Sequence, residues 1–146
     1  MTGRGSGIND WNVVKRPLGD PNKITPLVWP LVPGTWGQEK HFTWNNVNQK
    51  DATPMCGSVY TYYAEDVIKR PYDEEIFCLE TDGLKSTIWR FVHHRSKVDE
   101  DNFNTQPLVG VSRNGRFLLF NSNWDRQLGT VRNGQPRSDV WIVKLD

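Results

Sequence analysis

The C-terminal part of the chain alternates short apolar runs with turns, and this pattern restricts the fold more than any other sequence feature. The run 106–112 is followed by Asn114-Gly115, a pair that readily adopts the positive φ angles of a two-residue hairpin. The runs 117–121 and 139–145 are again apolar and of strand length. The sequence therefore predicts three antiparallel strands in this region.

The rest of the chain repeats this alternation, and no stretch has a helical periodicity. An acidic residue followed by apolar ones opens both 75–79 and 139–143, so that 41–92 and 106–146 resemble two copies of one unit. The first copy is predicted to have four strands and the second three, with part of another unit at 10–30. Besides the three C-terminal strands, strands are expected at 10–16, 24–29, 41–45, 57–64, 75–80 and 86–92.

Residues 112–116, Ser-Arg-Asn-Gly-Arg, precede an apolar run and resemble the Ser-Pro-Asp-Gly-(Lys/Arg) signature of TolB-type and WD40-like β-propeller repeats. The resemblance implies an all-β fold over 10–146, a partial β-propeller of about two to three four-stranded antiparallel blades. The Gly-rich, polar residues 1–7 predict a flexible leader at 1–9. The last unit lacks a fourth strand and a blade face needs a neighbour, so we expect completion by homo-oligomerisation or by the remainder of a larger propeller. The alternative is a self-contained β-sandwich of the same strands.

The composition limits the kinds of partner that the chain is expected to bind. A net charge of +1 over 146 residues gives no electrostatic basis for binding nucleic acid or an anionic membrane. No apolar run approaches the roughly 20 residues that cross a bilayer, and 1–7 lacks the apolar core of a signal peptide, so we expect a soluble protein in a compartment that the sequence does not name.

Cys56 and Cys78 lack metal-ligand spacing. Their strands would pair, which allows a disulfide, but we expect two buried free thiols.

The longer connections, 33–40, 65–73, 93–104 and 123–138, are predicted to share one face of the propeller, where a scaffold presents binding groups. Aromatic rings stack on sugars and Arg side chains bind directionally, and the same residue types recognise proteins. The favoured function is therefore a non-catalytic module, without a cofactor, that binds a glycan or a protein. The expected ligand-binding residues are Trp36, Arg70, Tyr72, His94, Arg95, Trp124 and Arg126.

A second interpretation starts from the adjacent His93 and His94. One of them, together with His41 at the start of a neighbouring strand, would provide half of a transition-metal site. The resemblance extends to oligogalacturonate lyase-type propellers, and it implies β-elimination on uronate oligosaccharides with manganese or another divalent metal at these histidines. The structural alternative to a metal site is that one His packs within the protein and Arg95 pairs with Asp99 or Glu100. A structural subunit that only assembles is the third possibility.

The tryptophans divide into two groups. Trp124 begins the longest connection, where it either stacks on a ligand or packs between blades, and packing is the expectation. The others that fall in predicted strands are expected in the core or between sheets. These are Trp29, Trp44, Trp89 and Trp141.

Overall fold

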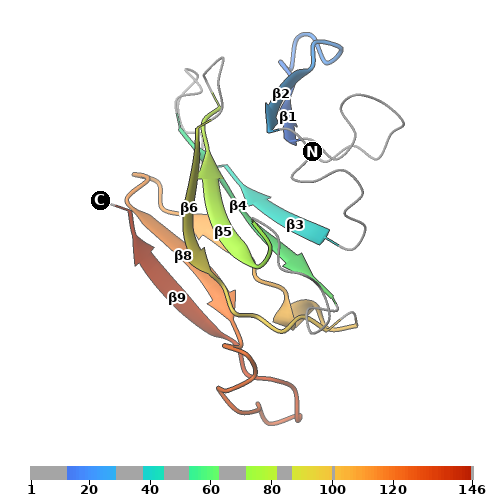
Figure 1. Cartoon of the computed structure of the whole chain (residues 1–146), viewed down its shortest axis with the longest axis vertical. Coiled ribbons are helices and arrows are strands. Elements are labelled where there is room, and N and C mark those ends of the chain that lie inside the picture. Colours follow the sequence, from blue (N-terminus) through green and yellow to red (C-terminus); the bar gives the residue numbers. More distant parts are fainter. Residues whose placement is uncertain are drawn as a thin grey trace.

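The computed structural model describes residues 13–28, 38–44, 53–62, 72–81, 87–99 and 101–145. These residues form nine strands and one short 3-10 helix (Figure 1). Every strand expected from the sequence is present, with slightly different bounds. The elements are β1 (Val13–Lys15), β2 (Thr25–Val28), β3 (Gln38–Thr43), β4 (Met55–Thr61), β5 (Glu75–Leu79), β6 (Ile88–His93), η1 (Phe103–Thr105), β7 (Val109–Val111), β8 (Phe117–Ser122) and β9 (Asp139–Lys144).

The strands form three sheets in which each strand pairs antiparallel with its neighbour in the chain. The first sheet is β1-β2, the second is β3-β4-β5-β6, and the third is β7-β8-β9. No sheet closes on itself within the described part of the chain. The all-β class and the grouping into two, four and three strands are thus confirmed.

The turn between β7 and β8 differs from the two-residue hairpin that Asn114-Gly115 predicts. The Ser112 N–H donates to the Phe117 carbonyl over 2.9 Å, so residues 113–116 connect the strands. In this turn only Gly115 has a positive φ, of 70°, whereas a type I′ hairpin needs positive φ at both central residues. Asn114 acts through its side chain instead, because its Oδ1 accepts the Ser112 hydroxyl over 2.8 Å.

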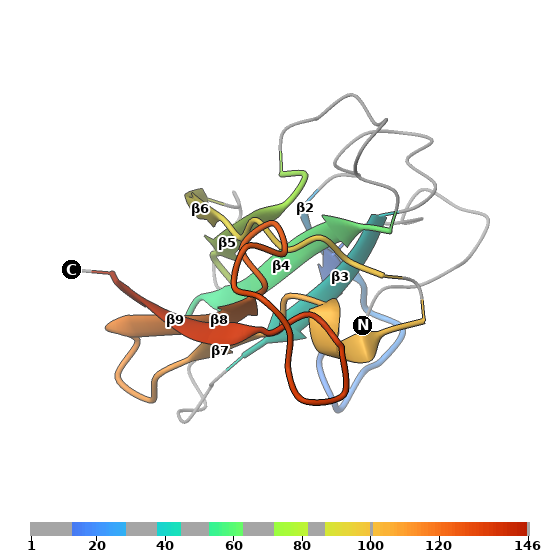
Figure 2. The same ribbon diagram turned by 90° about the horizontal axis from the view of Figure 1, so that it is seen from below.

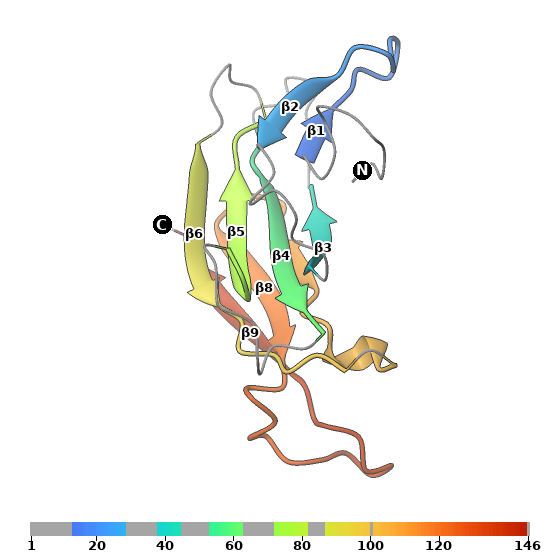
Figure 3. The same ribbon diagram turned by 45° about the vertical axis from the view of Figure 1, so that its right-hand side comes forward.

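The second sheet is the middle layer of the molecule. Figure 2 shows the third sheet beneath it, and Figure 3 shows the first sheet beside the ends of β4 and β5. Because β5 is covered on both faces, all of its residues are buried. The core between the second and first sheets consists of Val13, Leu27, Val59, Phe77 and Leu79. The core between the second and third sheets consists of Cys56, Ile76, Cys78, Leu118 and Phe120.

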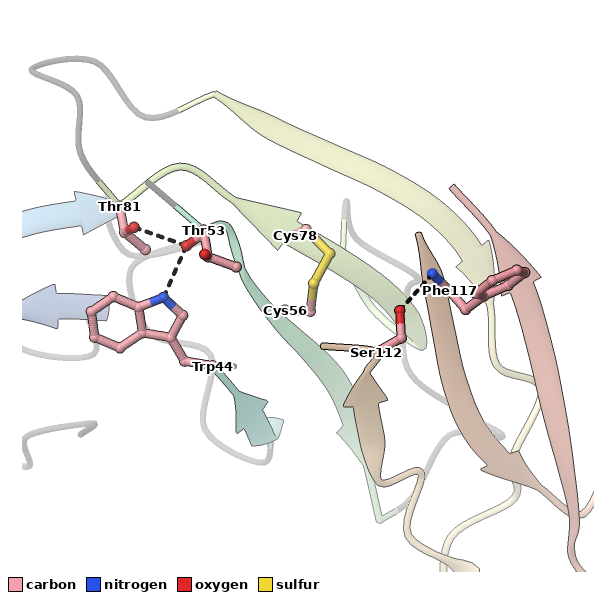
Figure 4. The surroundings of a disulfide bond; sticks show 7 residues. All are labelled: Trp44, Thr53, Cys56, Cys78, Thr81, Ser112 and Phe117. Carbon is pink, nitrogen blue, oxygen red and sulfur yellow. Dashed lines mark hydrogen bonds between the residues drawn. A yellow bond between two sulfur atoms is a disulfide. The ribbon is translucent and has the colours of Figure 1, made fainter. Parts of the chain in front are cut away.

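Cys56 and Cys78 form a disulfide, so the expectation of free thiols is wrong (Figure 4). The two residues are direct partners in the register of β4 and β5, with Cα atoms 4.0 Å apart. Direct partners point to the same face of an antiparallel sheet, which brings the two sulfur atoms together. The number of cysteines does not reveal which residues of β4 and β5 are paired, and this pairing decides whether the disulfide forms.

The expected position of the strand tryptophans, in the core or between sheets, is wrong for Trp44. Trp44 follows β3 and is 42% exposed, with its Nε1 donating to the Thr53 carbonyl over 2.9 Å (Figure 4). Trp89, in β6, is 38% exposed and lines a cavity together with Cys78 and Val111. Trp141 packs against the core between the second and third sheets, as predicted, and Trp29 lies outside the described residues.

Within the described residues, no helix has the length and apolarity that a membrane span requires.

Candidate functional site

Two long connections lie at the same end of the molecule, below the sheets in Figure 1. They are 94–108, between β6 and β7, and 123–138, between β8 and β9, while the β7–β8 turn lies at the opposite end. We call the surface formed by residues 94–99, 101–105 and 123–137 the long-loop face. Most of the other two connections predicted for this face, 33–40 and 65–73, lies outside the described residues.

The fully buried side chain of Asn123 joins the two connections. Its Oδ1 accepts the Lys97 N–H over 3.0 Å, and its Nδ2 donates to the Lys97 carbonyl over 2.9 Å. The side-chain amide therefore satisfies both polar groups of one backbone residue, as a neighbouring strand would. The Asp125 N–H also donates to the Arg95 carbonyl over 2.6 Å. These bonds fix the position of the face relative to the third sheet.

Trp124 is the centre of a stack of flat groups. Its ring centroid lies 4.3 Å from that of Trp141 with 24° between the planes, and the Arg95 guanidinium carbon lies 4.9 Å from the ring. The carboxylate of Asp125 accepts from Arg95 Nε over 2.7 Å and so holds the guanidinium in place. The prediction that Trp124 packs is confirmed, although its partners are Trp141 and a cation. A sugar ring that stacks on Trp124 has to displace one of these two partners.

Arg126 and Asp99 form a second ion pair across the two connections. The expected partner of Arg95 was Asp99 or Glu100. Arg95 pairs with Asp125 instead of Asp99, and Glu100 lies outside the described residues. Residues 124–126 all have positive φ, between 48° and 63°. Positive φ is uncommon for residues other than Gly, so this tight turn is held by contacts such as the two ion pairs.

The long-loop face combines exposed cationic and apolar side chains. Arg95 is 45% exposed and Arg126 is 50% exposed. Phe103, in η1, is 60% exposed, and Val131 is 44% exposed. The Asn102 side chain donates to Gln135 over 2.5 Å and ties η1 to the β8–β9 connection.

The three histidines have separate surroundings. The Ser96 N–H donates to His94 Nδ1 over 2.9 Å, so Nε2 carries the proton and donates to the Val59 carbonyl over 3.0 Å. His94 is fully buried, and both of its ring nitrogens bind backbone groups.

His41 Nε2 lies 2.9 Å from Gln106 Oε1 and 3.1 Å from the Tyr60 hydroxyl, whereas His93 Nε2 lies 3.5 Å from Glu75 Oε1. The described residues contain no group of three His, Cys, Asp or Glu side chains that could hold a metal ion.

Tyr72 belongs to a different cluster, around Glu75. The Arg90 guanidinium carbon lies 5.1 Å from the Tyr72 ring centroid, and Arg90 Nε donates to the nearly buried Glu75 carboxylate over 2.5 Å. This hydrogen bond raises the pKa of Arg90 above its ordinary value, although desolvation acts in the opposite direction. Tyr72 thus belongs to the cluster around Glu75 and Arg90, whereas Arg95 and Trp124 belong to the stack with Trp141.

Of the predicted binding residues, the long-loop face brings together Arg95, Trp124 and Arg126. His94 lies buried, Tyr72 belongs to the Glu75 cluster, and Trp36 and Arg70 lie outside the described residues. Sequence reasoning missed Phe103, whose exposure on a 3-10 turn has no periodic signal. It also missed the role of Asn123, which depends on a contact between distant segments.

No protein-family model, curated protein or solved structure matches the chain.

Proposed function

We propose that the chain is a non-catalytic binding module whose long-loop face recognises another protein. The supporting observation is the combination of the exposed Phe103, Arg95 and Arg126 on a face that Asn123 and two ion pairs hold in shape. Large aromatic and Arg side chains carry most of the binding energy in protein interfaces. A face that is ordered before binding loses little conformational entropy in the complex.

A protein fits this face better than a glycan. Carbohydrate recognition uses a free aromatic ring face, and the Trp124 ring already stacks with Trp141 and with the Arg95 guanidinium. Phe103 is the more exposed ring, and it lies edge-to-face with the His41 ring at a centroid distance of 6.1 Å. The manganese-dependent lyase alternative receives no support from the described histidines, which lie in three separate surroundings.

The experiment is site-specific photo-crosslinking in an extract of the source cells. A photoreactive phenylalanine analogue replaces Phe103 and, as the matched control, the fully exposed Leu18 of the β1–β2 turn. We expect one protein to be crosslinked from position 103 and not from 18, and to be lost in an Arg126→Glu variant.

Equal crosslinking from both positions contradicts the proposal. The proposal also fails if a glycan array gives a ligand whose binding requires Trp124.

A second candidate is assembly through the outer face of the third sheet, and with it we retain the propeller as the proposed architecture. Phe117, Leu119, Val140 and Ile142 are exposed on this face, which has no covering layer among the described residues. Apolar sheet faces of this kind require a neighbour. Light scattering coupled to size exclusion tests the idea, because a monomer at high concentration excludes homo-oligomerisation.

A further inference from the structure

The chain contains the tripeptide Arg-Asn-Gly twice, at 113–115 and 132–134, and in both copies the Asn is exposed in a turn. Asn side chains are chemically labile, and the backbone nitrogen of a following Gly reaches the side-chain amide most easily, because Gly has no Cβ. A Cβ added to Gly115 or Gly134 would meet no atom within 4 Å outside its chain neighbours. Both turns are therefore open to an attack by the Gly nitrogen on the Asn side chain.

The two asparagines also differ from others in the described residues by the state of the side-chain nitrogen. Asn102, Asn121 and Asn123 each donate a hydrogen bond from Nδ2. Nδ2 of Asn114 and of Asn133 bonds to no residue in the described part of the chain. The nitrogen that would leave as ammonia is thus held in the first three residues and free in the other two.

The two copies differ in the hydrogen bonds to the amide oxygen. Asn114 Oδ1 accepts the Ser112 hydroxyl over 2.8 Å and the Arg116 N–H over 3.2 Å. Asn133 Oδ1 accepts the Gln135 N–H over 3.2 Å and has no second donor among the described residues. In both turns the Gly N–H donates to a backbone carbonyl, so that bond does not distinguish them. Two donors polarise the Asn114 amide and stabilise the negative charge that develops on Oδ1 when a nucleophile adds to Cγ.

We propose that Asn114 is a site of spontaneous deamidation, and that the Ser112 hydroxyl accelerates the reaction. The Gly115 nitrogen bonds to Asn114 Cγ and loses its proton, while the bond from Cγ to Nδ2 breaks and ammonia leaves with that proton. Water then opens the resulting cyclic imide at either carbonyl. One product is an aspartate at position 114, and the other is an isoaspartate, whose backbone is longer by one CH2 group.

The two products affect the turn differently. The carboxylate of an aspartate accepts the same two donors, and its charge strengthens these bonds. An isoaspartate lengthens the backbone between Ser112 and Phe117, which changes the connection between β7 and β8. Both products add negative charge at the end of the third sheet opposite the long-loop face (Figure 1), so the modification is independent of the function proposed for that face.

The test follows deamidation in the purified full chain at neutral pH and physiological temperature. Lys97 and Lys144 are successive lysines, so cleavage after Lys releases both copies in one peptide, 98–144. Mass spectrometry with electron-transfer fragmentation measures the reaction at each Asn and distinguishes aspartate from isoaspartate. We expect Asn114 to react about tenfold faster than Asn133, less than the roughly 100- to 1,000-fold effect of a buried oxyanion donor, because water competes at an exposed turn.

The denatured chain is the control for the local sequence. In guanidinium chloride the two identical tripeptides lose their different hydrogen bonds, so the two rates should converge. Ser112→Ala removes the hydroxyl donor and should slow the reaction at Asn114 to about the rate at Asn133, whereas Ser112→Thr should keep the parent rate. Ser112 Oγ also accepts the Phe117 N–H, so amide exchange at Gly115 reports whether Ser112→Ala opens the turn. If it does, the ratio of the two rates in the parent decides the question.

Equal rates at Asn114 and Asn133 in the folded parent overturn the proposal, as does a faster reaction at Asn133. It also fails if Asn114 stays intact in the folded chain during the time in which the denatured chain reacts. A Ser112→Ala variant whose turn stays closed and whose Asn114 reacts as fast as in the parent refutes the role of the hydroxyl.

Discussion

Reduction of the Cys56–Cys78 disulfide is expected to lower the free energy of unfolding by about 3 kcal/mol. The two residues are 22 positions apart, and the chain entropy that closing such a loop removes from the unfolded state corresponds to about 3 kcal/mol at 25 °C. In a chain of this length each kcal/mol moves Tm by about 2–4 °C, so Tm should fall by about 10 °C. Urea unfolding followed by circular dichroism, with and without reductant, measures the difference.

The control is the double variant Cys56→Ala/Cys78→Ala, whose unfolding should not respond to reductant. Free-thiol titration of the denatured protein should detect no thiol before reduction and two cysteines afterwards. A stability loss below about 1 kcal/mol in the parent would refute the loop-entropy reasoning. Thiols that titrate before reduction would refute the pairing itself.

Three substitutions test the packing and the long-loop face. Gly57→Ala should destabilise the protein by about 1–3 kcal/mol, because a Cβ there would lie 2.7 Å from the Phe42 ring and 3.0 Å from a backbone carbonyl; urea unfolding checks this. Phe77→Ala should cost about 3–5 kcal/mol in the same assay, because the side chain is buried between two sheets. Asn123→Ala should cost about 2–3 kcal/mol and speed amide exchange at Lys97, whereas unchanged exchange there would contradict the role given to the Asn123 side chain.

The strands and their grouping were accessible from the sequence because both depend on local chemistry. The apolar run of β8, the β-branched residues of β9 and the turn at Asn114-Gly115 mark strand ends within a few residues. The turn type was less accessible, since the choice between a two-residue and a longer connection depends on the strand register as well as on the Asn-Gly pair. The two-four-three grouping was predicted from the repeated pattern of 41–92 and 106–146 and not from turn length, since the paired strands β8 and β9 are joined by the long connection 123–138.

Only part of the candidate site could be predicted from the sequence. Arg95, Trp124 and Arg126 were recognisable as a concentration of aromatic and cationic residues in long connections. The burial of His94 was not, because His94 and the exposed Arg95 are adjacent in the chain and only packing against Val59 separates their surroundings. Phe103 lacks a pattern that would distinguish an exposed ring from a core ring.

By itself the sequence determined the all-β class, the nine strands and the residue types of the long-loop face. Only the tertiary structure decided that Cys56 bonds to Cys78 and that Arg95 pairs with Asp125. The physical reason is the range of the interactions. Strand formation depends on neighbouring residues, whereas each of these contacts depends on a register between segments far apart in the chain, where a shift of one residue turns a side chain to the other face.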